Sequence, residues 1–157
     1  MLKLTLATSS GSPCKILCLG SHCDDIEIGC GGTLLKLSQQ LPQVELYWAA
    51  VFSSGQVRAR EARESAAHME HISKPPILEY EVPNYDGDLG TPNVFTHLDE
   101  SICRRKIEYL GTHFKSQPHK HWFDEGAFWA LLRLRGIEAH APSKYAEAFY
   151  CRKSVLD

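Results

Sequence analysis

The sequence predicts a single α/β domain built on a parallel sheet. Two apolar runs of strand length, at residues 15–20 and 44–52, enclose a helical pattern at residues 31–40. Such runs are typical of strands buried on both faces, and the order strand, helix, strand indicates a right-handed crossover between parallel strands. The length of 157 residues fits one domain, 1–157, with one core.

The elements of the N-terminal half follow from these patterns. Residues 1–14 are a poor match to a signal peptide, and we expect a frayed leader there. Three leucines share one face of the helix predicted at 31–40, and a proline stands just past its end. After the second strand, the charged and alanine-rich stretch 56–69 predicts another helix.

The second half begins with a segment rich in turn residues, in which residues 77–82 form a short predicted strand. Apolar residues at helical spacing predict an amphipathic helix at 98–114. Asp124 is a good N-cap for a further helix that runs to Gly136, and the aromatic segment 145–152 predicts a closing strand.

Composition narrows the class of partner. The 17 Lys and Arg residues are balanced by 19 Asp and Glu, so the chain lacks the excess of positive charge that would attract nucleic acids or anionic membranes. The longest apolar stretch, "LYWAAVF", is far below the ~20 residues that cross a bilayer. Six cysteines in a chain with an ordinary core, one of them inside a core strand, predict a reduced cytoplasmic protein. We therefore expect a small-molecule partner, no nucleic acid and no membrane.

The stretch "SHCDD", directly after the first strand, carries the candidate catalytic residues. In open parallel sheets, ligands bind beyond the carboxyl ends of the strands. His22 and Asp25 are three residues apart, so one turn can aim both side chains at zinc or another divalent metal. Asp24 remains beside the metal, where a carboxylate can take a proton from bound water. An isolated H-x-D-D is more often a solvated loop, but the strand before it and the glycines after it favour a hydrolase site.

Glycines at 29, 31 and 32 are expected to turn the chain from the loop into the helix and to leave amide groups free there. Such a terminus favours negative charge, which suits the two aspartates and also suits a phosphate. The spacing differs from the dinucleotide pattern G-x-G-x-x-G. Cys23 and Cys30 flank the site as alternative zinc ligands, although Cys30 is expected to pack as a small apolar residue.

Taken together, these residues resemble the signature of the PIG-L/LmbE-like family of metal-dependent N-deacetylases. The family pattern, A-H-P-D-D-E followed by G-C-G-G-T, is matched at His22, Asp24, Asp25 and residues 29–33. Cysteine replaces the usual proline, and Ile-Glu replaces the usual acidic and apolar pair. Four later segments are also similar to the family: Arg58 with Glu61, and residues 112–117, 133–136 and 145–149.

The resemblance implies a role for four of these residues. His22 and Asp25 would bind zinc, Asp24 would be the general base, and Arg58 would contact the substrate. The substrate class implied is an N-acetylated sugar or a related small molecule. The fold implied is a Rossmann-like parallel sheet with helices on both faces.

The chain departs from the family in its centre. A further strand and a histidine-rich motif, which supplies the third zinc ligand and a second catalytic histidine, are absent, as if a segment near 69–76 were missing. Losing a strand exposes ladder edges and favours a homo-oligomer. A catalytic zinc needs three protein ligands. Four histidines are candidates for the third position, although a surface or helix-start role is favoured for each: His97, His113, His119 and His121.

Three functions therefore compete. The leading one is a zinc-dependent amide hydrolase that removes an acetyl group. The alternative is a shortened, inactive relative that keeps the fold and weak metal or sugar binding. A nucleotide- or phosphate-binding module is the third and ranks well below them, because it would leave the histidine and the aspartates without a task.

Overall fold

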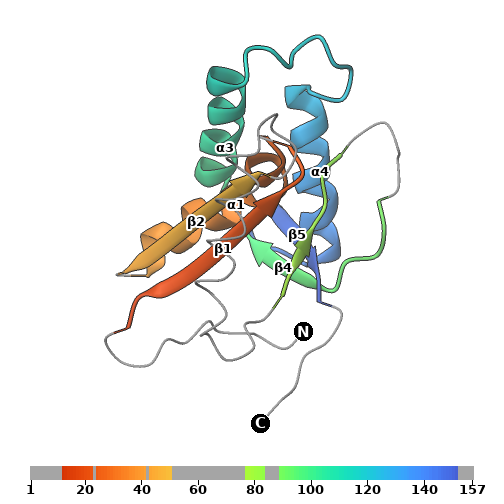
Figure 1. Ribbon diagram of the computed structural model, residues 1–157. Coiled ribbons are helices and arrows are strands. Elements are labelled where there is room, and N and C mark those ends of the chain that lie inside the picture. Colours follow the sequence, from red (N-terminus) through yellow and green to blue (C-terminus); the bar gives the residue numbers. More distant parts are fainter. Residues whose placement is uncertain (1–11, 23, 42, 51–76, 84–88, 152–157) are drawn as a thin grey trace.

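The computed structural model describes residues 12–22, 24–41, 43–50, 77–83 and 89–151. In this part the chain has a mixed α/β fold with three helices and two small sheets (Figure 1). The strands β1 (Cys14–Gly20) and β2 (Val44–Ala50) form a parallel pair. An antiparallel sheet has the order β3 (Glu79–Tyr80), β5 (Ala146–Tyr150), β4 (Val94–His97). The predicted parallel sheet is thus present as the β1–β2 pair.

The helix α1 (Asp25–Gln40) connects the two parallel strands, so the predicted order strand, helix, strand is confirmed. The strands pair in register from Cys14 opposite Val44 to the ends of both strands. The expected leader at 1–14 lies mostly outside the described residues, and Cys14 already belongs to β1. In Figure 1, α1 lies behind the β1–β2 pair.

The start of α1 differs from the prediction, because the helix begins at Asp25 and the three glycines lie inside it. Acidic residues in the first turn favour this earlier start by complementing the helix dipole. A side chain at Gly29 would overlap the ring of Tyr80, and a Cβ at Gly32 would lie 2.9 Å from Glu147 Oε1. These two glycines therefore permit close packing, and the predicted turn from loop into helix is wrong.

The elements of the second half are largely as predicted. The helices α3 (Glu100–His113) and α4 (Glu125–Glu138) begin and end within two residues of their predicted bounds. Asp124 caps α4, since its Oδ1 accepts a hydrogen bond from the amide of Ala127 at 3.2 Å. The closing strand is confirmed as β5, whereas β4 was not predicted and the strand expected at 77–82 has only two residues.

The two largest of three apolar clusters among the described residues hold these elements together. The larger one joins α3 to α4, which lie side by side in Figure 1. Its buried members are Ile28, Leu98, Ile102, Cys103, Ile107, Leu110, Phe123, Phe128 and Leu132. The second cluster lies between β1, α1 and β5 and contains Cys18, Ile26, Cys30, Leu34 and Phe149.

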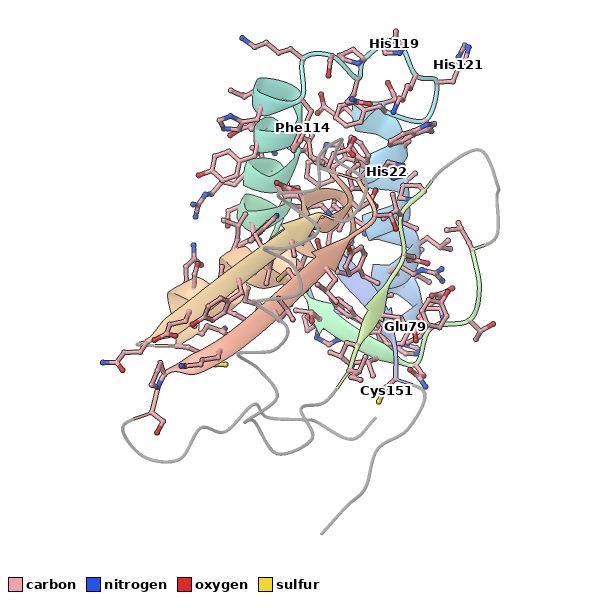
Figure 2. All side chains as sticks on the ribbon, viewed as in Figure 1. His22, Glu79, Phe114, His119, His121 and Cys151 are labelled. Atoms are coloured by element: carbon pink, nitrogen blue, oxygen red, sulfur yellow. The ribbon has the colours of Figure 1, made fainter. Side chains whose placement is uncertain are left out.

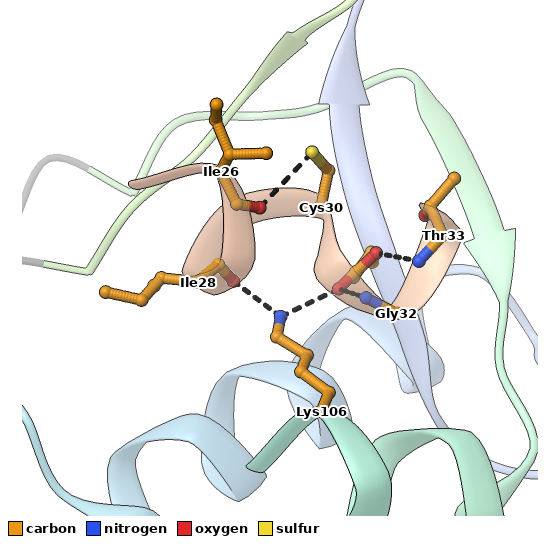
Figure 3. Close-up of polar contacts among 7 residues, drawn as sticks. Ile26, Ile28, Cys30, Gly32, Thr33 and Lys106 are labelled. Atoms are coloured by element: carbon orange, nitrogen blue, oxygen red, sulfur yellow. Dashed lines mark hydrogen bonds and ion pairs between the residues drawn. The ribbon is translucent and has the colours of Figure 1, made fainter. Parts of the chain in front are cut away.

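A buried ion pair ties α3 and β5 to the middle of α1 (Figure 3). Lys106 Nζ donates to Glu147 Oε1 at 2.7 Å and to the carbonyl of Ile28 at 2.5 Å. The carboxylate of Glu147 also accepts the amides of Gly32, at 2.8 Å, and Thr33, at 2.6 Å. In a regular α-helix the Gly32 amide donates to the Ile28 carbonyl. Lys106 thus binds the Ile28 carbonyl, and Glu147 binds the Gly32 amide.

Several predictions fall outside the described residues. These are the helix at 56–69 with Arg58, the apparent deletion near 69–76, and Cys23. Within the described ranges, no helix is long and apolar enough to cross a membrane.

Candidate functional site

The candidate site lies where β1 ends and α1 begins. Gly20 closes the strand, and the space at its Cα is narrow: a Cβ there would lie 3.0 Å from the carbonyl oxygen of His22 and 3.1 Å from Ile26 Cγ1. The backbone therefore turns closely around this glycine. As a result, His22 and the two aspartates follow β1 within one turn, at the carboxyl end of the strand.

The structure brings His22 and Asp25 together, as the spacing predicted. The amide of His22 donates to Asp25 Oδ2 at 2.7 Å, and the same oxygen lies 3.5 Å from His22 Nδ1. Two ligands at about 2.0–2.1 Å from a tetrahedral zinc are roughly 3.4 Å apart. The nitrogen and oxygen atoms therefore have a separation that suits one metal ion.

Asp24 is buried beside this pair, with only 4% of its surface exposed. Its Oδ2 has no hydrogen-bond partner among the described residues. A buried carboxylate oxygen without a partner costs about 1–3 kcal/mol or more, because its hydration is lost and not replaced. Such a group is typical of a functional site, where a proton, a cation or a ligand completes the bonding.

Glu27 is a third acidic residue of the site, and the sequence did not predict it. Its Oε2 is also buried and has no partner among the described residues. Burial raises the pKa of Glu27, and the charges of Asp24 and Asp25 raise it further, while His113 lowers it. The spacing of Asp24 and Glu27 could have predicted this residue, since residues three apart on a helix share a face.

The third metal ligand is not found in the described part of the chain. No three His, Cys, Asp or Glu side chains there converge on one point. His97 Nε2 lies 3.2 Å from the carbonyl oxygen of Ala139, at the end of α4. His119 and His121 lie on the outer loop between α3 and α4, away from His22 (Figure 2). His113 is the candidate whose charge affects the site, through Glu27.

The predicted free amides at the glycines are occupied. The amides of Gly32 and Thr33 donate to Glu147, which places a carboxylate where a phosphate would have to bind. A negative side chain on these donors disfavours an anion there. The phosphate-binding interpretation therefore loses the groups on which it depended.

Cys30 packs as a small apolar residue, as expected. Its Sγ lies 3.3 Å from the carbonyl oxygen of Ile26, and the side chain is buried beside Cys18. The hydrogen bond with Cys18 and burial both raise the pKa of Cys30, which keeps the thiol protonated. A protonated thiol is a poor zinc ligand.

Comparison of the chain with models of known protein families finds no match, and a search of curated proteins finds none either.

Proposed function

We propose that this protein is a metal-dependent amide hydrolase of the PIG-L/LmbE-like type, an N-deacetylase with Asp24 as its general base. The observation that carries the proposal is the buried, unpartnered Oδ2 of Asp24 next to the paired His22 and Asp25. The fold proposed is the Rossmann-like one of that family, in which the β1–α1–β2 unit is the first crossover. The reaction proposed is removal of acetate from an N-acetylated sugar or a related small molecule.

The residues fit a divalent metal by donor type and spacing, and they supply two of the three ligands of a catalytic zinc. His22 Nδ1 and Asp25 Oδ2 are the atoms that would hold it. When bound, zinc supplies a Lewis acid that acidifies water and polarises a carbonyl.

Asp24 has the position and environment of a proton acceptor. Its carboxylate is buried, and no hydrogen bond from the described residues competes with a proton for its Oδ2. A general base must lie within hydrogen-bond reach of the proton that it removes, and a site with little water limits the leakage of that proton. Asp24 would take the proton from the attacking water and later return it to the amine nitrogen.

The second candidate is a shortened relative that binds metal or sugar weakly and hydrolyses nothing. The described residues favour it in one respect, since they gather two ligands and not three. A two-ligand site would hold zinc loosely. The two candidates thus differ in metal affinity before any substrate is tested.

The first experiment measures the zinc content and zinc affinity of the folded chain, with His22→Ala as the site variant and His121→Ala as the control. His121 is an exposed histidine on the outer loop, so its loss should not affect the site. One tightly held zinc, lost only in His22→Ala, supports the hydrolase. Weak binding in a folded protein supports the inactive relative.

The second experiment follows acetate release from N-acetylglucosamine compounds. Removing a general base typically costs about 10²–10⁴-fold in rate. We expect Asp24→Asn to lose activity on that scale while it keeps bound metal. Equal rates for Asp24→Asn and the unmodified chain would contradict the mechanism.

A further inference from the structure

A groove runs along α1 from Glu27 and lies outside the residues of the proposed mechanism. It has a volume of about 180 Å³. The floor comes from α1, where residues at steps of three and four share one face. These floor residues are Glu27, Gly31, Leu34, Leu35 and Ser38.

The walls of the groove are apolar and aromatic. Leu46 and Trp48 of β2 form one side, and Tyr109 of α3 lies on the other. In the parallel register Leu46 stands beside Ile16 and Trp48 beside Cys18, so both lie on the sheet face that packs against α1. They are nevertheless 37% and 46% exposed, because α1 covers β1 more completely than β2.

The charge in the groove is negative. Glu27 Oε2 is buried without a hydrogen-bond partner in the described part of the chain. Lys106 also lines the groove, but its ammonium is bound to Ile28 and Glu147, so it contributes only its aliphatic stem. Asp24 and Asp25 act on Glu27 with the same sign of charge. The end of the groove near Glu27 therefore suits a positive or hydrogen-bond-donating group.

We propose that this groove binds a primary amine with an apolar or aromatic body, whose ammonium contacts Glu27 and whose body lies between the leucines, Trp48 and Tyr109. Aromatic rings beside a carboxylate are a favourable environment for an ammonium group. The volume is below the ~300–1,000 Å³ of drug-sized pockets, which limits the ligand to a single ring or a short chain.

Under the proposed function, on which this one assignment rests, the amine is the half of the substrate that remains after deacetylation. Hydrolysis breaks the C–N bond, places the hydroxyl of water on the acetyl carbon and leaves its proton on nitrogen. The product amine is protonated at neutral pH and carries the charge that Glu27 would bind. The groove would then narrow the proposed substrates, an N-acetylated sugar or a related small molecule, to an N-acetylated arylalkyl or alkyl amine.

The test is a calorimetric titration of the folded chain with 2-phenylethylamine, and with 2-phenylethanol and glucosamine for comparison. Glu27→Gln removes the charge but keeps the shape, and Glu108→Gln removes an exposed glutamate of α3 as a control. Losing a hydrogen bond to a charged group weakens binding on the order of ten- to hundredfold. We therefore expect the affinity for 2-phenylethylamine to fall about ten- to hundredfold in Glu27→Gln and to stay unchanged in Glu108→Gln. The alcohol 2-phenylethanol should bind weakly to the unmodified chain and to Glu27→Gln.

A second variant fills the groove without disturbing the fold. An added Cβ at Gly31 meets nothing closer than Lys106 Cγ at 3.8 Å, so Gly31→Leu places its side chain in the groove. This variant should bind no amine. Amine affinity that is unchanged in Glu27→Gln, or no saturable amine binding to the unmodified chain, would overturn the inference. So would a dimer that Gly31→Leu converts to a monomer, which assigns the groove to a second copy.

The titration separates this inference from the proposed function. Amine binding without acetate release from either N-acetyl-2-phenylethylamine or N-acetylglucosamine compounds keeps the groove assignment and removes the hydrolase. Acetate release from N-acetylglucosamine compounds without amine binding keeps the hydrolase and removes the groove assignment.

Discussion

Lys106 Nζ lies 2.7 Å from Glu147 Oε1, and neither side chain is more than 5% exposed. The pair is more than a contact between two charges, because Lys106 also donates to the carbonyl oxygen of Ile28 in α1 and Glu147 accepts from the amide of Gly32. A buried pair of this kind adds little net stability over an apolar pair of equal size. Removing one partner is nevertheless strongly destabilising, because it leaves the other charge buried and unpaired.

The first prediction concerns the charge of Glu147 when Lys106 is replaced. Lys106→Met should lower the free energy of unfolding by about 3–5 kcal/mol, because Glu147 keeps a buried charge without its cation. Urea denaturation at neutral pH measures the loss. Arg105→Met, at the exposed neighbouring position, should change stability by no more than ~0.5 kcal/mol. Similar values for the two variants would mean that the pair is not buried as described.

Gly29 and Gly31 should respond to alanine in opposite directions. Alanine at Gly29 meets the ring of Tyr80, which is fixed by a 2.6 Å hydrogen bond from its hydroxyl to the carbonyl oxygen of Leu19. The overlap should cost about 1–3 kcal/mol. Alanine at Gly31 makes only ordinary van der Waals contacts, the nearest at 3.8 Å from Lys106 Cγ, and should add about 0.5–1 kcal/mol through helix propensity. Thermal melts of both variants check the signs, and two losses would contradict the packing of α1.

Glu27 should make stability depend on pH. Burial, with Asp24 and Asp25, raises the pKa of Glu27 in the folded state, so the folded chain binds this proton more readily than the unfolded chain. Its contribution to stability is therefore lost as pH rises from about 4 through the raised pKa. Glu27→Gln should gain stability relative to the unmodified chain between pH 4 and pH 7. Urea midpoints at several pH values test this, and a difference that stays constant with pH would refute it.

Cys103 should resist alkylation. Burial raises the pKa of this thiol to about 12, so at pH 8 its thiolate is on the order of a thousandfold rarer than that of an ordinary cysteine. Peptide mapping after iodoacetamide treatment at pH 8 should find Cys103 unmodified in the folded protein and modified in denaturant. Cys14, which is half-buried at the start of β1, serves as the comparison. Equal labelling of the two cysteines in the folded chain would exclude this burial.

The sequence predicts the helices of this fold better than its strands. Periodic apolar residues and the Asp124 cap located α3 and α4, because these signals are local. The strands β3 and β4 are short and pair with β5, about fifty or more residues later in the chain, so the local sequence pattern contains little information about them. The start of α1 was missed because glycine was interpreted as a turn residue and not as a residue that admits Tyr80 and Glu147.

The candidate site was predictable in part for the same reason. His22 and Asp25 meet within one turn, so their spacing was sufficient. Glu27 and the buried ion pairs depend on contacts between distant elements. The sequence does contain a signal that Lys106 and Arg135 are buried. Arg135 pairs with Glu81 at 2.6 Å, and its side chain is only 2% exposed. Both cations stand in line with apolar residues on the inner faces of their helices, where a charge needs a buried partner.

The central place of β5 has a consequence for the order of events during protein synthesis. This strand lies between β3 and β4, and its Glu147 binds the amide of Gly32 across 115 residues of sequence. While the ribosome is still making the second half, α1 has neither its carboxylate nor its lysine, and both antiparallel neighbours lack their shared strand. Contacts this distant in sequence form slowly, because the intervening loop must close first. The nascent chain therefore lacks these contacts until β5 emerges, and unpaired strand edges of this kind favour aggregation during that interval.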